Sequence, residues 1–297
     1  LIILGMVTSL SLPPFNYFIL NFFTFTIFFL FLIKKTDQTN NKKIYFIYGW
    51  LFGFGYFVTN LYWISISLTF DQNYKFLIPF SIILIPTFLG LFYGLISYLF
   101  ILFKPKNIIS SFLLFSLIFG ILEFIRGTIL TGFPWNLVAF SFSNQLEILS
   151  INSVIGTYGF NLFCISLFVS PSIFIFRRKK KDLVVCVFFF ITFLFFYFYG
   201  INYNEKFNKA EKENYDYKIR IIGSNISLDR FYYNIDTVTV IEDLIKISEP
   251  NKSEKTIFIW PEGILPGISQ KELIEYSWLF NKNFNENHLL IIGTNSQ

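Results

Sequence analysis

The stretch Ile257-Phe258-Ile259-Trp260-Pro261-Glu262-Gly263 decides how the polar C-terminal third of this chain folds. Its run of three apolar residues predicts a strand buried on both faces. Pro261 ends that strand, because proline has no backbone N–H for the ladder. The strand end then presents the carboxylate of Glu262. Such a carboxylate is well placed to act as a general base; the alternative is a solvated side chain that only marks the end of the strand.

The residues around this strand predict an α/β domain. Strand patterns at 217–222, 256–260 and 289–293 alternate with helical patterns at 233–248 and 270–281. Alternation of this kind is typical of a layered domain. Because an α/β domain that stopped directly after a strand would leave a sheet edge uncovered, we expect this domain to be incomplete at its C-terminus.

The first two hundred residues are a series of apolar segments. The chain is 54% hydrophobic with a mean hydropathy of +0.55, far from a soluble average. The pattern predicts a helical membrane domain at 1–200, a tether at 201–218 and the α/β domain at 219–297. A membrane crossing needs roughly 20 apolar residues, and we predict seven spans: 1–12, 15–33, 44–70, 76–103, 108–125, 151–176 and 183–200.

Loop charges predict how the spans are oriented. Loops rich in Lys and Arg remain in the cytoplasm. The loops on one side carry only Lys75 and Arg126, so we expect that side, and the α/β domain with it, to lie outside the cytoplasm. The loops on the other side carry eleven basic residues: Lys34, Lys35, Lys42, Lys43, Lys104, Lys106, Arg177, Arg178, Lys179, Lys180 and Lys181.

The segment between the fifth and sixth predicted spans is the second place where functional residues gather. Glu123 and Arg126 are three residues apart, so they share a helix face and can pair. Ionisable groups at membrane depth are costly and usually face a polar cavity or partner. Arg126 is either suited to a lipid phosphate or reaches to the interface. The turn with Gly132, Pro134 and Trp135 is either an interfacial anchor or a lip for substrate entry.

Metal and nucleic-acid chemistry find little support in the sequence. Cys164 and Cys186 lie in apolar runs, which indicates buried side chains rather than a disulfide. With one histidine, His288, we expect no metal site, and we interpret His288 as a surface residue at the entry of a strand rather than as a base. The basic run at 177–181 is interpreted as a topology determinant rather than a nucleic-acid patch.

Six pieces of the chain together resemble the bacterial apolipoprotein N-acyltransferases, the membrane-bound branch of the nitrilase superfamily. Their order and spacing carry the resemblance. They are Pro13-Pro14-Phe15-Asn16, Arg126-Gly127 followed by Thr131-Gly132-Phe133-Pro134-Trp135, Gly156-Thr157-Tyr158-Gly159, Asn225-Ile226, Trp260-Pro261-Glu262 and Ile292-Gly293-Thr294. The resemblance implies that the C-terminal domain is a nitrilase-like αββα sandwich at the outer face of the cytoplasmic (inner) membrane.

The resemblance also implies acyl transfer by a Glu-Lys-Cys triad without a cofactor. A cysteine takes a fatty acyl chain from a phospholipid as a thioester, and the N-terminal amine of a diacylglyceryl-cysteine lipoprotein then attacks it. Glu262 matches the base. Arg126, Pro134 and Trp135 are expected to bind substrate, with Phe231, which stands where the family usually has Trp. The Lys and Cys have no match in this chain, so we expect these residues alone to be inactive.

Two other functions stay open. A seven-span transport or sensor protein with an extracytoplasmic binding domain would carry polar or broken sites in the middle of its spans. Here Pro79 and Pro86 are the only breakers in the middle region, which favours an anchor. A membrane-anchored amidase would share the nitrilase-like fold, and an acyl-chain groove continuous with the bilayer would distinguish the acyltransferase from it.

Overall fold

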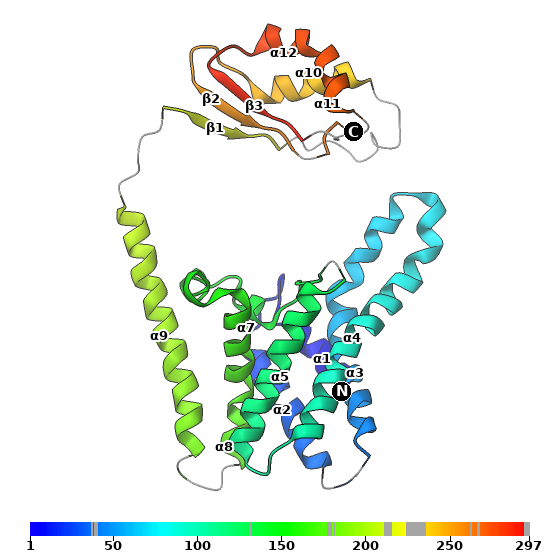
Figure 1. Ribbon diagram of the computed structural model, residues 1–297, viewed down its shortest axis with the longest axis vertical. Coiled ribbons are helices and arrows are strands. Elements are labelled where there is room, and N and C mark those ends of the chain that lie inside the picture. The colour runs from blue at the N-terminus through cyan, green and yellow to red at the C-terminus, as the bar shows by residue number, and fades with distance from the viewer. Residues whose placement is uncertain are drawn as a thin grey trace. The chain divides into compact units, whose positions relative to one another are not determined.

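The computed structural model describes residues 1–36, 38, 41–130, 132–176, 180, 182–210, 216–223, 236–261, 263–265 and 268–293. The chain divides into two compact units, Leu1–Ala210 and Glu211–Gln297. In the first, called the helical unit below, the described elements are all helices, and the second, the sheet unit, combines a parallel sheet with helices (Figure 1).

The helical unit follows the order of the predicted spans, with a 3-10 helix (η) extending one end of α3 and of α4. Its elements are α1 (Ile2–Ser9), α2 (Ile19–Lys35), α3 (Lys43–Leu61), η1 (Tyr62–Thr69), η2 (Gln72–Leu77), α4 (Ile78–Phe103), α5 (Ile108–Thr128), η3 (Val138–Phe142), α6 (Leu146–Leu149), α7 (Asn152–Val169), α8 (Pro171–Phe176) and α9 (Asp182–Lys209).

Several of these helices are long enough to cross a bilayer. Within the described residues five stretches qualify by length and composition: Lys43–Thr69, Gln72–Phe103, Ile108–Thr128, Asn152–Phe176 and Asp182–Lys209. The other two predicted spans correspond to α2, with 17 residues, and α1, with 8. At 1.5 Å per residue, α1 covers only about 12 Å. The count of seven spans therefore stays a prediction.

Aromatic contacts and close backbone approach hold the helical unit together. Lipid tails are as apolar as the side chains, so helices in a bilayer associate through tight packing. Phe28 of α2 stacks on Phe52 of α3 with ring centroids 4.2 Å apart. Helices α3 and α4 meet closely because Gly49 has no Cβ, and the Tyr93 carbonyl and the Ser97 side chain occupy that space.

The basic loops gather at one end of the helical unit. The C-terminal ends of α2, α4 and α8 lie there, together with the beginnings of α3, α5 and α9 (Figure 1). The Lys104 ammonium donates a hydrogen bond to Thr36 Oγ1 at 3.4 Å, which links two of these loops. The charge asymmetry read from the sequence is thus an asymmetry between the two ends of the bundle.

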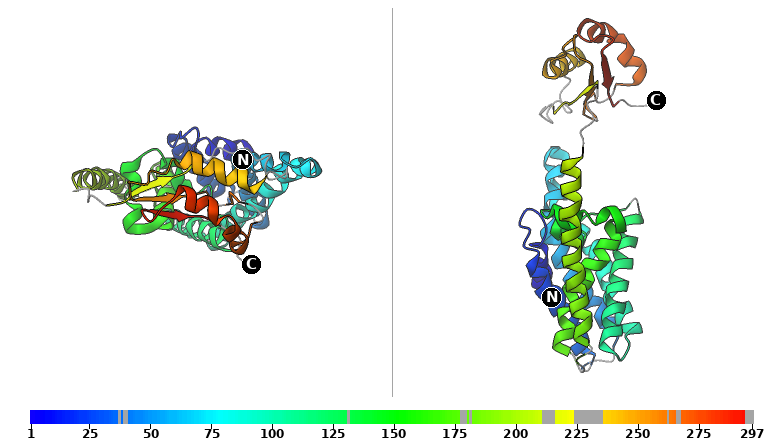
Figure 2. Two further views of the ribbon diagram at one scale, coloured as in Figure 1. Left: turned by 90° about the horizontal axis from the view of Figure 1, so that it is seen from above. Right: turned by 90° about the vertical axis from the view of Figure 1, so that its left-hand side faces the viewer.

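Helix α9 lies on the outside of the bundle (Figure 1, Figure 2). It runs on through Lys209, so the segment interpreted as a tether from residue 201 begins as helix. Of its described side chains, only Asp182, Phe196 and Gly200 are buried. Gly200 packs directly on the backbone carbonyl of Glu147 in α6, where a Cβ would collide.

The sheet unit contains β1 (Lys218–Ile221), α10 (Thr237–Ser248), β2 (Thr256–Ile259), α11 (Gln270–Glu275), α12 (Ser277–Asn283) and β3 (His288–Ile291). The strands are parallel in the order β1-β2-β3. This confirms the predicted alternation of strands and helices, although the helix expected at 270–281 is divided at Tyr276. The described residues form this one sheet.

Among the described residues, helices cover one face of the sheet only. Helices α10 to α12 lie on the same side (Figure 1), where Phe258 packs with Ile241 and Leu244. The prediction of strands buried on both faces is therefore wrong for this sheet. The strand register places six apolar side chains on the uncovered face: Ile219, Ile221, Ile257, Ile259, Leu289 and Ile291. The four of them on the edge strands are between 48% and 76% exposed.

We expect Gly200→Ala to destabilise the helical unit. The alanine gains about 1 kcal/mol in helix propensity, but forcing a Cβ against the Glu147 backbone costs about 1–3 kcal/mol. A backbone contact cannot rotate away, so the cost should exceed the gain. The measurement is the thermal midpoint in detergent. Phe198→Ala, on the exposed side of the same helix, is the control, and an unchanged midpoint for Gly200→Ala would contradict the packing.

Candidate active site

A buried ion pair lies in the last turns of helix α5. Glu123 and Arg126 are 0% and 1% exposed. Arg126 Nη2 donates to Glu123 Oε2 at 2.8 Å, and Nε donates to Oε1 at 3.2 Å. This two-bond fork is the strongest pairing available to a carboxylate and a guanidinium. The prediction that the two residues share a helix face and pair is confirmed.

Arg126 also fixes the loop that follows α5. Its Nη1 donates to the carbonyls of Phe133 at 2.8 Å and Trp135 at 3.0 Å. A guanidinium carries five N–H donors, and Arg126 donates four hydrogen bonds within the protein. Arg126 therefore lies beneath the loop instead of reaching to the interface. Its role in substrate binding stays a proposal. In this geometry Arg126 could act on a substrate only indirectly, by holding the loop backbone.

Helix α3 supplies one contact to Arg126 and one to the loop. The ring of Phe57 lies 5.3 Å from the guanidinium carbon of Arg126, a distance at which a cation is attracted to an aromatic face. The Tyr56 hydroxyl donates to the carbonyl of Asn136 at 2.8 Å. The turn itself needs Gly132, whose φ is +80° and whose missing Cβ leaves room for the Gly127 carbonyl.

The loop and η1 enclose an apolar cleft. Trp135 stacks on Trp63 with ring centroids 5.3 Å apart and an interplanar angle of 16°, and Phe133 lies 5.4 Å from Trp135. Pro134 is exposed at the tip of the loop. The cleft, about 540 Å³ in volume, is called the aromatic cleft below; its lining residues are Trp63, Ile64, Ile66, Ser67, Phe70, Phe133 and Trp135. Sequence reasoning missed Trp63, because no spacing signal connects it to Trp135.

The remaining predicted site residues belong to the sheet unit. Glu262 and Phe231 lie outside the described residues. The strand that leads to Glu262 is firmly held, since the Trp260 N–H donates to the Ile291 carbonyl and its indole donates to Ser248 Oγ, both at 3.0 Å. After it, Gly263 has a φ of +66°, and the next two residues, Ile264 and Leu265, are buried. The position of Glu262 as a base stays a prediction.

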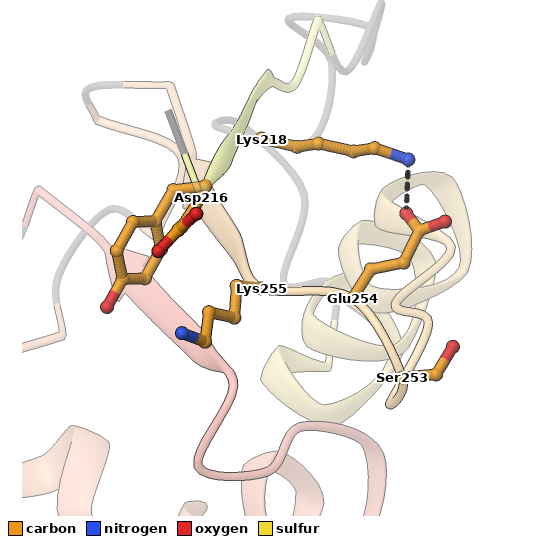
Figure 3. A pocket seen from close by; sticks show the side chains of 6 residues that line it. Asp216, Lys218, Ser253, Glu254 and Lys255 are labelled. Carbon is orange, nitrogen blue, oxygen red and sulfur yellow. Dashed lines mark hydrogen bonds and ion pairs between the residues drawn. The ribbon is translucent and has the colours of Figure 1, made fainter. Parts of the chain in front are cut away.

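A polar surface pocket lies at the other, amino-terminal end of the strands (Figure 3). Lys218 Nζ lies 2.7 Å from Glu254 Oε2, and this hydrogen-bonded pair lowers the pKa of the Glu254 carboxyl. Ligands of parallel sheets bind at the carboxyl ends of the strands instead. The pocket, of about 450 Å³, therefore reads as solvated surface; its lining residues are Asp216, Tyr217, Lys218, Ser253, Glu254 and Lys255.

The surroundings of His288 and of the two cysteines suit structural rather than catalytic roles. The Asn285 N–H donates to His288 Nδ1 at 3.3 Å, and Nε2 lies 2.9 Å from the Asn251 carbonyl. His288 is the first residue of β3 and is half-buried, so the interpretation of His288 as a strand-entry residue is confirmed. Cys164 is buried in α7, as predicted, whereas Cys186 in α9 is only partly buried.

Comparison with known proteins places this architecture in a family. The family model described as the N-terminal domain of apolipoprotein N-acyltransferase matches residues 4–170, more than half of the chain. The chain belongs to the apolipoprotein N-acyltransferase family. This finding and the long apolar helices together make it a membrane protein.

Two relatives in this family match well beyond the length of the helical unit. The apolipoprotein N-acyltransferase of Rhodopseudomonas palustris is 29% identical over 283 residues, covering 90% of this chain and 52% of that protein. The one from Brucella melitensis is 25% identical over 277 residues, covering 89% of this chain and 51% of that protein. That of Rhizobium etli is 32% identical over 177 residues, 57% of this chain and 33% of that protein. The chain thus spans about half the length of the first two relatives.

Proposed function

We propose that this chain belongs to an enzyme that transfers a fatty acyl chain from a phospholipid to the N-terminal amine of the diacylglyceryl-cysteine of an apolipoprotein. The family match over residues 4–170 carries the proposal. Trp260-Pro261-Glu262, which follows the central strand in the sequence, supports it, because it is one of the six pieces that together carry the resemblance to the family.

Glu262 is the proposed general base. It takes the proton of the cysteine thiol, and the thiolate attacks the ester carbonyl of the phospholipid. The lysophospholipid leaves with the proton, and the acyl chain stays on the cysteine as a thioester. The lipoprotein amine then attacks the thioester, Glu262 takes the amine proton, and the thiolate leaves as the amide forms. A lysine would stabilise the oxyanion in both halves of the reaction.

The lysine and the cysteine of that triad match no residue of this chain. Cys164 is fully buried within a membrane helix, where no ester carbonyl can approach it. Cys186 lies in helix α9 within the same unit, with its sulfur 3.8 Å from Ser170 Oγ. We therefore propose that residues 1–297 on their own form no thioester.

Substrate contacts are proposed for the loop after α5 and for Phe231. Trp135 and its neighbour Pro134 stand at the aromatic cleft, and Arg126 acts by holding the backbone there. Both proposed substrates are lipids, and an apolar cleft in the membrane unit suits their acyl chains. The same observation favours the acyltransferase over an amidase of the same superfamily, which has no need of such a cleft.

The fold and location proposed for the complete domain are a nitrilase-like αββα sandwich at the outer face of the bacterial inner membrane. The uncovered apolar face of the sheet supports the sandwich, since such a face normally packs against a second layer. The clustering of basic loops at one end of the helical unit supports the location.

We expect Glu262→Gln in the full-length gene product to lower thioester formation from labelled phospholipid by at least about a hundredfold, the usual contribution of a general base. The amide keeps the shape of the side chain but cannot take a proton. Membrane insertion should be unchanged. Glu254→Gln, which removes an exposed carboxylate of the same unit, is the matched control. Full activity in Glu262→Gln would remove Glu262 from the mechanism.

Reporter fusions test the proposed orientation. Fusions at Lys179 and at Asn251 should report the cytoplasm and the outside respectively, because eleven basic residues hold one set of loops inside. The measurement is the activity of a reporter that works on one side only. Two cytoplasmic signals would contradict the proposed location of the sheet unit.

A further inference from the structure

The loop wall of the aromatic cleft is held in place by one buried nitrogen. Arg126 Nη1 donates to the carbonyls on both sides of Pro134, at 2.8 Å to Phe133 and 3.0 Å to Trp135. These bonds fix the backbone from which the two aromatic side chains of the cleft project. The position of Trp135 against Trp63 therefore depends on where the guanidinium lies.

Glu123 determines where the guanidinium lies. Its two oxygens accept from Nε and Nη2 of Arg126 at 3.2 and 2.8 Å, and both side chains are completely shielded. A guanidinium presents its donors in a rigid plane, so pairing Nε and Nη2 with one carboxylate also orients the two donors on Nη1. An uncompensated charge in such a site is strongly unfavourable. Glu123 thus acts on the cleft without touching it.

The lining of the cleft indicates what it binds. Ser67 is the single polar residue in a lining that otherwise consists of aromatic and aliphatic side chains, and none of the lining residues is charged. The donors of Arg126 that face the loop are used on backbone carbonyls, so the cleft offers no cation for a headgroup phosphate. An apolar chain is the ligand that this chemistry suits.

We propose that Glu123 is a positioning residue which, through Arg126, keeps Trp135 stacked on Trp63, so that the aromatic cleft takes one acyl chain of a phospholipid. The choice of ligand rests on the proposed function, whereas the positioning of Trp135 stands on the contacts alone. The two parts can therefore be tested by separate measurements on the same variants.

The experiment uses the protein in nanodiscs and two readouts. The first is the circular dichroism of the stacked indoles, defined as the difference between the wild type and Trp135→Phe. The second is photolabelling of the loop and η1 by a phosphatidylethanolamine with a diazirine in its acyl chain. The variants are Glu123→Gln, Arg126→Lys and the neutral double variant Glu123→Gln/Arg126→Gln. Glu205→Gln is the control, because it breaks a solvent-exposed pair with Lys209 at 3.4 Å.

We expect each of the three variants to lose the indole signal. The labelling should fall at least about tenfold, which corresponds to about 1.4 kcal/mol of binding free energy. Glu205→Gln should match the wild type. The double variant leaves no unpaired buried charge, so it should fold even where Glu123→Gln does not, and it separates loss of position from loss of folding. Arg126→Lys keeps the charge but not the planar fork.

Three results would overturn the proposal, each at a different point. A double variant or an Arg126→Lys variant with the full indole signal would show that the pair does not position Trp135. Wild-type protein that gives the indole signal but no labelling of the loop or η1 would remove the acyl chain as the ligand. Labelling that persists in Trp135→Phe and in all three variants would place the bound chain elsewhere, even if the proposed acyl transfer is correct.

Discussion

The order of the loop after α5 and of the aromatic cleft depends on the guanidinium of Arg126. A charge inside a membrane-spanning bundle must be neutralised and hydrogen-bonded, and here one carboxylate and two loop carbonyls do so. Because the carbonyls belong to residues on either side of Pro134, satisfying the charge also fixes the loop. The ring of Phe57 completes the enclosure. The buried charge thus orders a loop that would otherwise be free to move at the interface.

The sequence indicates part of this arrangement and not the rest. The spacing of Glu123 and Arg126 on a helix predicts their pairing. It does not predict the bonds to Phe133 and Trp135, which depend on a turn with positive φ at Gly132 and Asn136. The stacking of Trp135 on Trp63 depends on where η1 follows α3, and no local pattern encodes that position. Arg126 therefore reads from sequence as an interfacial group, while the structure buries it.

In the sheet unit, local patterns predict the elements better than their surroundings. The apolar runs place all three strands, and Pro261 marks the end of β2. The runs do not reveal that only one face is covered, because an apolar side chain looks the same in sequence whichever layer it meets. Charge does not show where α9 ends, because the charged residues after 200 that predict a tether are still helical up to Lys209. Glu205 and Lys209 pair one helical turn apart and extend the helix instead.

We propose that this chain belongs to an enzyme that N-acylates lipoproteins, and this activity can be measured on its product. The most direct measurement is the mass of the N-terminal lipopeptide of a reporter lipoprotein, in cells depleted of their own N-acyltransferase activity and supplied with the full-length gene product. We expect a lipopeptide with a third acyl chain, attached as an amide to the cysteine amine. A lipopeptide that keeps only its diacylglyceryl group, with the protein present in the membrane, would contradict it.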